Sequence, residues 1–86
     1  MHRTTVRFWT CFDKLPEPIQ NLSHRVFSHF KTNPSYPSLH FKKVGIFWSV
    51  RIGMNFRALA IKHEEDYIWV WIGTHDEYER MIKESN

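Results

Sequence analysis

The sequence predicts one α+β domain, with an N-terminal helical hairpin packed on a twisted four-stranded antiparallel sheet and a helix at the C-terminus. Two observations support this fold class. Apolar residues recur at helical spacing before the Asn33-Pro34 step, and they alternate at strand spacing after it. A chain of 86 residues also has room for one hydrophobic core but not for two, so residues 1–86 are expected to form a single domain.

The first half of the chain contains two stretches with helical periodicity. Residues 6–14 have apolar side chains at this spacing, and Thr4 or Thr5 can cap the start of the helix. Pro18 then suits the first turn of a second helix, where its missing N–H removes no hydrogen bond. The second helix has an amphipathic stripe that stops before Asn33 and consists of Ile19, Leu22, Val26, Phe27 and Phe30. The two helices form the hairpin.

The second half of the chain has the composition of a sheet. Residues 33–38 have turn-forming side chains. Four segments rich in β-branched and aromatic residues follow, at 39–43, 47–52, 56–62 and 67–73. The short connections between them predict an antiparallel meander. Thr74 and Glu77 form a capping box, which predicts a final helix over 74–83 with Tyr78 on its inner face.

The composition indicates a protein of the cytoplasm with no membrane partner. Cys11 is the one cysteine, so no internal disulfide can form, which fits a reducing compartment. The longest apolar run, at 68–72, is too short to cross a bilayer, and the first residues lack the apolar region of a secretory signal.

Positive and negative charges are segregated along the chain. Residues 1–63 contain ten Lys or Arg against two acids, a net charge of +8, and residues 64–86 contain two against seven, a net charge of −5. Such segregation suggests a positive surface that binds phosphate groups and a separate acidic patch that aids solubility. The hypothesis is a basic sheet face that binds a polyanion such as RNA.

The register of the hairpin around residues 53–55 decides which side chains share a face. A three-residue turn, with Asn55 accommodating a positive φ, places Arg51 opposite Arg57 and gathers only apolar residues on the other face. A two-residue turn would mix the faces, so burial excludes it. Two like charges side by side are unfavourable unless an anion such as phosphate bridges them. Alternatively, both side chains extend into solvent or stack on Trp69 and Trp71.

Further basic residues lie on the preceding strand. Alternation sends His40 and Lys42 to one face and Lys43 to the other, so only one set can join the arginines. These three residues are candidates for contacts with RNA. The alternative is a solvated edge strand that lysines protect from aggregation.

An imidazole and a phenol are expected together at the start of the last helix. His75 is at the first position of that helix, and Tyr78 follows about one turn later. A helix N-terminus favours a phosphate, and the same two residues can serve acid–base chemistry. The alternative is a structural histidine. No nucleotide-binding glycine loop and no zinc-binding spacing is present, so we expect neither a cofactor nor a metal site.

Three sequence segments resemble the RelE/ParE superfamily of toxins from type II toxin–antitoxin systems. They are LHFKKV at 39–44, WSVRIGMNFRAL at 48–59 and WIGTHDEYER at 71–80, and the resemblance extends to LPEPIQ at 15–20. It implies a helical hairpin on a twisted sheet with a concave basic surface. Members commonly begin with a β-strand, and here only about five residues precede the first helical pattern, so that strand is expected to be short or absent.

The resemblance also implies a function. In the RelE-like branch, the toxin is a metal-independent endoribonuclease that cuts mRNA on the ribosome and is neutralised by a cognate antitoxin. His75 would then be an acid or base, Tyr78 an orienting or proton-relaying group, and Arg51 and Arg57 the stabilisers of the phosphorane. The alternatives are a ParE-like toxin that inhibits DNA gyrase and cuts nothing, and an inactive interaction module with the same basic sheet.

Overall fold

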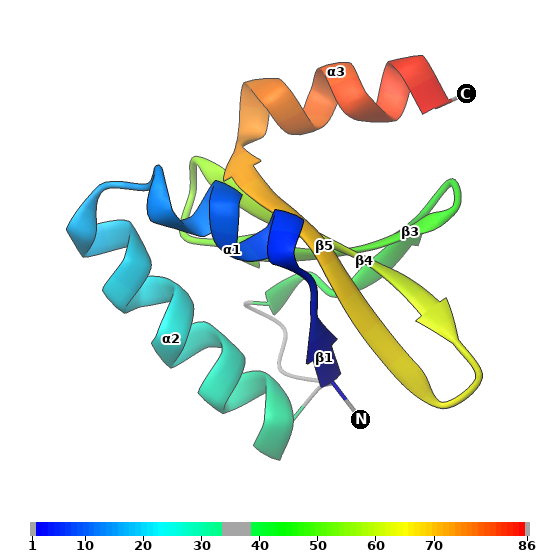
Figure 1. Cartoon of the computed structure of the whole chain (residues 1–86), viewed down its shortest axis with the longest axis horizontal. Helices are drawn as coiled ribbons and strands as arrows, with labels where there is room; N and C mark the ends of the chain where they lie inside the picture. Colours follow the sequence, from blue (N-terminus) through cyan, green and yellow to red (C-terminus); the bar gives the residue numbers. More distant parts are fainter. Residues whose placement is uncertain (1, 34–38, 86) are drawn as a thin grey trace.

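Within residues 2–33 and 39–85, which the computed structural model describes, the chain begins with a short strand and ends with a helix (Figure 1). The elements run in the order β1 (His2–Thr4), α1 (Val6–Asp13), α2 (Glu17–Thr32), β2 (Lys42–Val44), β3 (Phe47–Ile52), β4 (Phe56–His63), β5 (Asp66–Thr74) and α3 (His75–Ser85). The predicted turn at 33–38 lies, apart from Asn33, outside the described residues.

A short N-terminal strand, which the periodicity of the sequence did not predict, changes the sheet. The described residues form a five-stranded sheet in the order β1-β5-β4-β3-β2. Strands β2 to β5 make the predicted antiparallel meander, but β1 pairs in parallel with β5, with Arg3 opposite Ile68. The prediction of a four-stranded, wholly antiparallel sheet that follows the helices is wrong in these details. Strand β1 is too short to show a period of two, and its partner lies near the other end of the chain.

The helical hairpin begins and ends close to the predicted positions. Thr5 is the N-cap of α1, and its Oγ1 accepts a hydrogen bond from the backbone N–H of Phe8 at 3.2 Å.

Strand β3 has the predicted bounds, whereas β2 is shorter than predicted. It starts late because Leu39 is buried in the core and His40 has a φ of 47°, a left-handed conformation that does not continue a strand.

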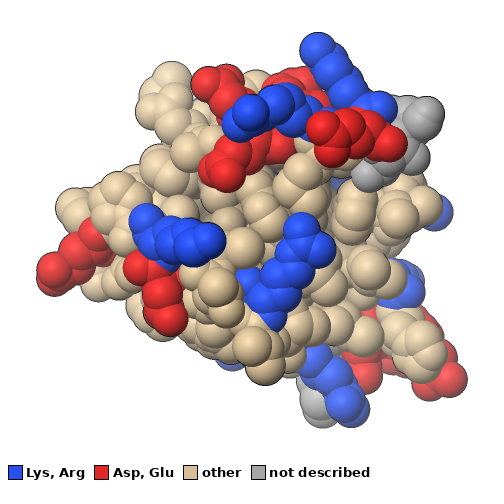
Figure 2. Space-filling view, turned by 45° about the horizontal axis from the view of Figure 1, so that its top comes forward, with Lys and Arg blue, Asp and Glu red and all other residues tan. Residues whose placement is uncertain are grey.

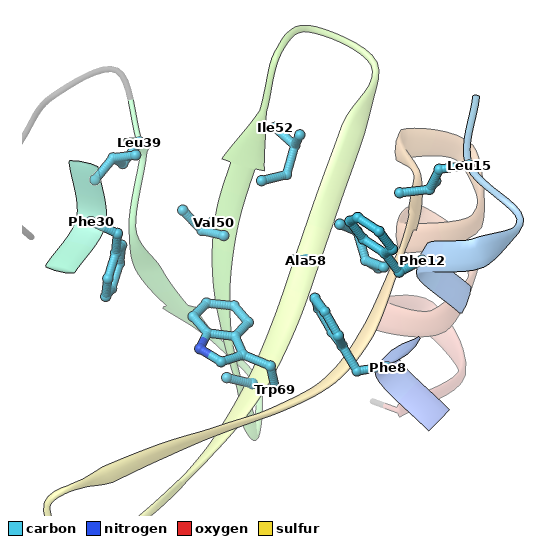
Figure 3. Close-up of a cluster of buried hydrophobic side chains, with 11 residues drawn as sticks. Phe8, Phe12, Leu15, Phe30, Leu39, Val50, Ile52, Ala58 and Trp69 are labelled. Atoms are coloured by element: carbon cyan, nitrogen blue, oxygen red, sulfur yellow. The ribbon is translucent and has the colours of Figure 1, made fainter. Parts of the chain in front are cut away.

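The main core lies between the helical hairpin and one face of the sheet. Figure 3 shows Phe8 and Phe12 of α1 and Trp69 of β5 around Ala58, with Phe30 of α2 on the far side of Val50. The rings of Phe30 and Trp69 meet edge to face, with centroids 6.0 Å apart. Large rings bury much apolar area per residue, which a domain of this size needs.

A β-bulge divides two tryptophans between the faces of the sheet. Leu59 pairs with Trp71, but the next residue, Ala60, pairs with Trp69, so β5 has one extra residue at this point. Trp69 therefore enters the main core, whereas Trp71 joins Leu59 and Tyr78 in a second core under α3. Because the two indoles lie on opposite faces, they do not form a common platform on which Arg51 and Arg57 could stack.

His2 ties β1 to the core through an imidazole that must stay neutral. Its Nδ1 accepts a hydrogen bond from the indole Nε1–H of Trp69 at 3.1 Å, and its ring packs edge to face on Phe30. Burial, followed by repulsion from positive charges that include Lys31, lowers the pKa of His2 below its usual value.

The lowered pKa of His2 predicts a loss of stability in acid. The unfolded chain takes up the proton first, so this contribution is complete above about pH 6.5 and is lost as the pH falls from there through the folded-state pKa. Urea unfolding at about pH 7.5 and about pH 5.5 should show a larger decrease for the wild type than for His2→Phe. An equal decrease in the two proteins would contradict this assignment.

Across the residues that the structure describes, no helix combines the length and the hydropathy that a bilayer crossing requires.

Candidate functional site

The predicted register of the β3–β4 hairpin is confirmed. Arg51 pairs with Arg57, Val50 with Ala58 and Ile52 with Phe56. Val50, Ile52 and Ala58 are fully buried on the helical side of the sheet, so the Cα–Cβ bonds of both arginines point to the opposite side, although the side chain of Arg51 also reaches a pocket that α2 lines. The left-handed residue of the turn is Gly53, with a φ of 63°, and not Asn55 as predicted. Glycine adopts this conformation without strain, and a Cβ at Gly53 would also crowd Leu22.

Both guanidinium groups are held by carbonyl groups of their own hairpin. The Nε–H of Arg51 donates to the carbonyl of Gly53 at 2.9 Å, and an Nη1–H of Arg57 donates to the carbonyl of Phe56 at 2.8 Å. The Nη1 of Arg51 also lies 3.3 Å from Nε2 of His40. A guanidinium has five N–H donors, so these bonds leave donors for an anion.

The pair carries an electrostatic cost that a bound anion would offset. Burial, and then repulsion by Arg51, lowers the pKa of Arg57 below its usual value, while Tyr78 and Glu79 act in the opposite direction. An arginine side chain normally loses its proton only far above neutral pH, so Arg57 stays charged at neutral pH despite the lowered pKa. A phosphate between the two side chains would replace repulsion with charge-assisted hydrogen bonds.

The start of α3 is tied to the tip of the hairpin. His75 is the first residue of α3, as predicted, and its backbone N–H donates to the carbonyl of Asn55 at 2.7 Å. The imidazole lies 5.7 Å from the ring of Tyr78, measured between centroids, and Tyr78 is 8% exposed. The Nε2 of His75 also lies 3.3 Å from Oε1 of Glu79. Sequence reasoning missed Glu79, although its spacing of four residues from His75 was a usable signal.

Two adjoining pockets flank the hairpin tip. One, of about 320 Å³, is lined by Arg57 and His75 together with the turn, so the structure brings these two predicted residues together. The other, of about 440 Å³, is lined by Arg51 and His40. Met54 lines both pockets. We call His40, Arg51, Arg57 and His75 the hairpin-tip site.

The two lysines of β2 lie on different faces of the sheet. Lys42 pairs with Ser49, which is on the same face as Arg51, so Lys42 can extend the hairpin-tip site. Lys43 pairs with Trp48 and lies on the opposite face, away from the arginines. Both lysines are exposed at the edge of the sheet. Of the three predicted RNA contacts, the geometry therefore groups His40 and Lys42 with the arginines and separates Lys43 from them.

The predicted capping box at the start of α3 is confirmed. The backbone N–H of Glu77 donates to Oγ1 of Thr74 at 3.2 Å, and Oε1 of Glu77 accepts from the backbone N–H of Thr74 at 3.1 Å. Hydrogen bonds from Thr74, the backbone one first, lower the pKa of Glu77. The carboxylate thus already occupies part of the positive field at this helix end.

Removing the cap should destabilise the domain modestly. We expect Thr74→Ala to cost about 1 kcal/mol at neutral pH, because the N–H of Glu77 loses its acceptor. Since the folded-state pKa of Glu77 is lowered, its own contribution is present above about pH 4.3 and is lost as the pH falls through the folded-state value. Urea unfolding of Thr74→Ala should be compared with Thr74→Ser, which keeps the hydroxyl. An equal loss in both variants would show that the hydroxyl is not the cause.

Charge on the surface is more mixed than the segregation along the sequence suggests. In Figure 2, acidic and basic side chains gather together in the upper part of the view, and side chains of both signs are scattered over the lower part. Helix α3 supplies both signs, with Asp76, Glu77 and Glu79 beside Arg80 and Lys83. Among the described residues, no group of three or more His, Cys, Asp or Glu side chains could hold a metal ion.

The comparisons with known proteins found similarity among solved structures. No protein-family model and no curated protein matches the sequence. The RelB–RelE antitoxin–toxin complex from Methanococcus jannaschii contains a chain that aligns with a TM-score of 0.72 at 13% identity, over 92% of this chain and 96% of that one. The toxin–antitoxin complex RelBE2 from Mycobacterium tuberculosis gives 0.65 at 18% identity, over 87% and 96%.

A third solved structure agrees with these two. A copper-bound mutant toxin from Helicobacter pylori aligns with a TM-score of 0.59 at 16% identity, over 88% of this chain and 94% of that one. All three alignments span 87% or more of this chain and 94% or more of the other chain, so the likeness extends over most of the fold. The chain therefore has the fold of the RelE-like toxins.

Proposed function

We propose that this protein is the toxin of a toxin–antitoxin system and that it cuts mRNA on the ribosome without a metal ion. One observation supports this activity most strongly: a paired guanidinium, Arg57, lines the same pocket as the imidazole of His75. The hydrogen bond between His75 and Asn55 sets the position of α3 relative to the hairpin. A cation and an acid–base group are thus available for one phosphodiester.

The proposed reaction is the attack of a ribose 2′-hydroxyl on the adjacent phosphorus. A base removes the proton from the 2′-hydroxyl, the bond from phosphorus to the 5′-oxygen breaks, and an acid returns a proton to that oxygen. His75 would serve as the acid or the base, and Tyr78 would orient it. Arg51 and Arg57 would stabilise the charge that develops on the phosphorane, and Lys42 would hold a flanking phosphate.

The proposed partner is a cognate antitoxin. The structures from Methanococcus jannaschii and Mycobacterium tuberculosis are complexes of a toxin with an antitoxin. We extend this arrangement to the present chain, whose basic hairpin-tip site would be blocked by a partner of complementary charge. A small acidic or DNA-binding protein encoded in a neighbouring reading frame should copurify with the chain and suppress its toxicity.

Mapping of mRNA 5′ ends after induction tests the proposed activity. We expect new 5′ ends within translated codons, and we expect an inhibitor of translation initiation, which keeps mRNA from entering elongating ribosomes, to abolish them. The control is His75→Ala, which should give no new ends. DNA-damage signalling without new mRNA ends would favour gyrase inhibition and reject the nuclease. Neither response, with normal growth, would indicate an inactive interaction module.

A further inference from the structure

An apolar groove adjoins the hairpin-tip site on the side of α2. It has a volume of about 440 Å³ and lies between α2, Leu39 and His40 before β2, and the β3–β4 turn. Its apolar walls are formed by Leu22, Val26, Leu39 and Met54. Leu39 is 3% exposed and belongs to the core, so this wall is fixed, whereas Met54 is 76% exposed at the tip of the turn.

The rim of this groove carries a positive charge and two planar side-chain groups. Arg51 and His40 both line it, and their side chains meet at a distance of 3.3 Å between Nη1 and Nε2. The hydrogen bond from Nε of Arg51 to the carbonyl of Gly53 sets the orientation of the guanidinium plane. Imidazole rings and guanidinium planes are groups on which the bases of single-stranded RNA stack.

The backbone of His40 indicates that its position is imposed by its neighbours. Its φ of 47° is uncommon for a residue with a Cβ. Leu39 on one side is buried, and Phe41 on the other packs against the core. The core thus holds both neighbours of His40 and leaves its imidazole at the rim of the groove, beside Arg51. Such strained residues often occur at ligand sites.

From this juxtaposition we infer that the groove binds one nucleobase of RNA, next to a phosphate held by Arg51 and Arg57; the inference rests on the proposed function. Arg51 contributes to both the base site and the phosphate site, because it lines the groove and pairs with Arg57. A nucleotide supplies an anion and a flat, weakly polar ring in one unit, which matches a cationic rim beside apolar walls. An apolar peptide side chain would fill the walls but leave the charge of Arg51 without a partner.

The experiment uses the full chain and two RNA probes. The first is a trinucleotide with 2′-O-methyl sugars, which cannot undergo attack by a 2′-hydroxyl, and the second has an abasic central nucleotide. Methyl NMR spectra would follow Leu22, Val26, Leu39 and Met54 during titration. We expect the intact probe to shift these methyl signals and to bind on the order of tenfold more tightly than the abasic probe. Equal affinities without methyl shifts would overturn the inference.

Variants separate this inference from the proposed function. His40→Ala should reduce the difference in affinity between the two probes, whereas His63→Ala, a matched exposed histidine on β4, should not. Arg51→Ala should weaken both probes, because the phosphate contact is common to them. If Arg51→Ala weakens both probes but the abasic probe binds as tightly as the intact one, the phosphate site stands and the base site is rejected. Groove methyl shifts caused by an acidic, leucine-containing peptide but not by RNA would also reject it.

Discussion

Replacing Arg57 by alanine is expected to reduce mRNA cleavage by about 10²- to 10³-fold, the usual effect of removing one donor from a charge-stabilising site. Arg57 shares a pocket with His75 and forms a cross-strand pair with Arg51, so its loss removes the cation that lines the same pocket as the proposed acid–base group. The rate of appearance of new mRNA 5′ ends after induction measures the effect. Arg57→Lys should recover only part of the activity, because it keeps the charge but loses the planar fork of donors.

Two controls are needed for this result: the stability of the variant, and the replacement of an arginine outside the hairpin-tip site. The hydrogen bonds of Arg57 go to the carbonyls of Phe56 and Met54 in its own hairpin, and its removal relieves repulsion with Arg51, so the variant should unfold at nearly the wild-type temperature. Arg80→Ala removes an exposed arginine from α3 and should leave cleavage unchanged. If Arg57→Ala and His75→Ala both cut mRNA at the wild-type rate, the roles assigned to these residues are wrong.

Gly73→Ala is expected to give the largest loss of stability, about 1–3 kcal/mol, as overpacking does in well-packed interiors. A Cβ at Gly73 would overlap the indole of Trp71 and lie 3.0 Å from Oε1 of Glu77. Trp71 belongs to the second core with Leu59 and Tyr78, so its ring cannot move without disturbing α3. Thermal unfolding should show a decrease in Tm of about 4–8 °C for each kcal/mol in a domain of this size.

A double-mutant cycle identifies the cause of that loss. Trp71→Phe has a smaller ring, so adding Gly73→Ala to it should cost less than the same change in the wild type. Equal costs in both backgrounds would show that the indole is not the obstacle. Gly73 also pairs with Arg57 across the sheet. A backbone shift at Gly73 that makes room for the added methyl group would therefore also move Arg57, and it should reduce cleavage as well as stability.

The local pattern of the sequence was sufficient to predict the register of the β3–β4 hairpin and the start of α3. The alternation of apolar residues in 48–60 admits only one register that buries them all, and this register sets Arg51 opposite Arg57. The capping box likewise predicted that α3 starts at His75 and that Tyr78 is on its inner face. These predictions succeeded because the residues that determine each outcome lie within one or two turns or strands of each other.

Contacts between distant segments decided the pairing of β1, the faces of the two tryptophans and the positions of His40 and His75. Strand β1 exists because β5 offers it a pairing edge, and the bulge beside Leu59 sends Trp69 and Trp71 to opposite faces. The arrangement of His40 against Arg51, and of His75 against Asn55, depends on how the strand edge and α3 dock on the hairpin. None of these contacts leaves a periodic signal in the sequence.

The sequence by itself thus determined the three helices, strands β3 to β5 and the pairing of two arginines on one face, since periodicity and burial act over short distances. The tertiary structure alone decided that Lys42, and not Lys43, shares the face of Arg51, that the backbone of His75 docks on Asn55 and that an apolar groove adjoins Arg51. The physical reason is that side chains far apart in the chain meet only after the core has set the relative positions of their backbones.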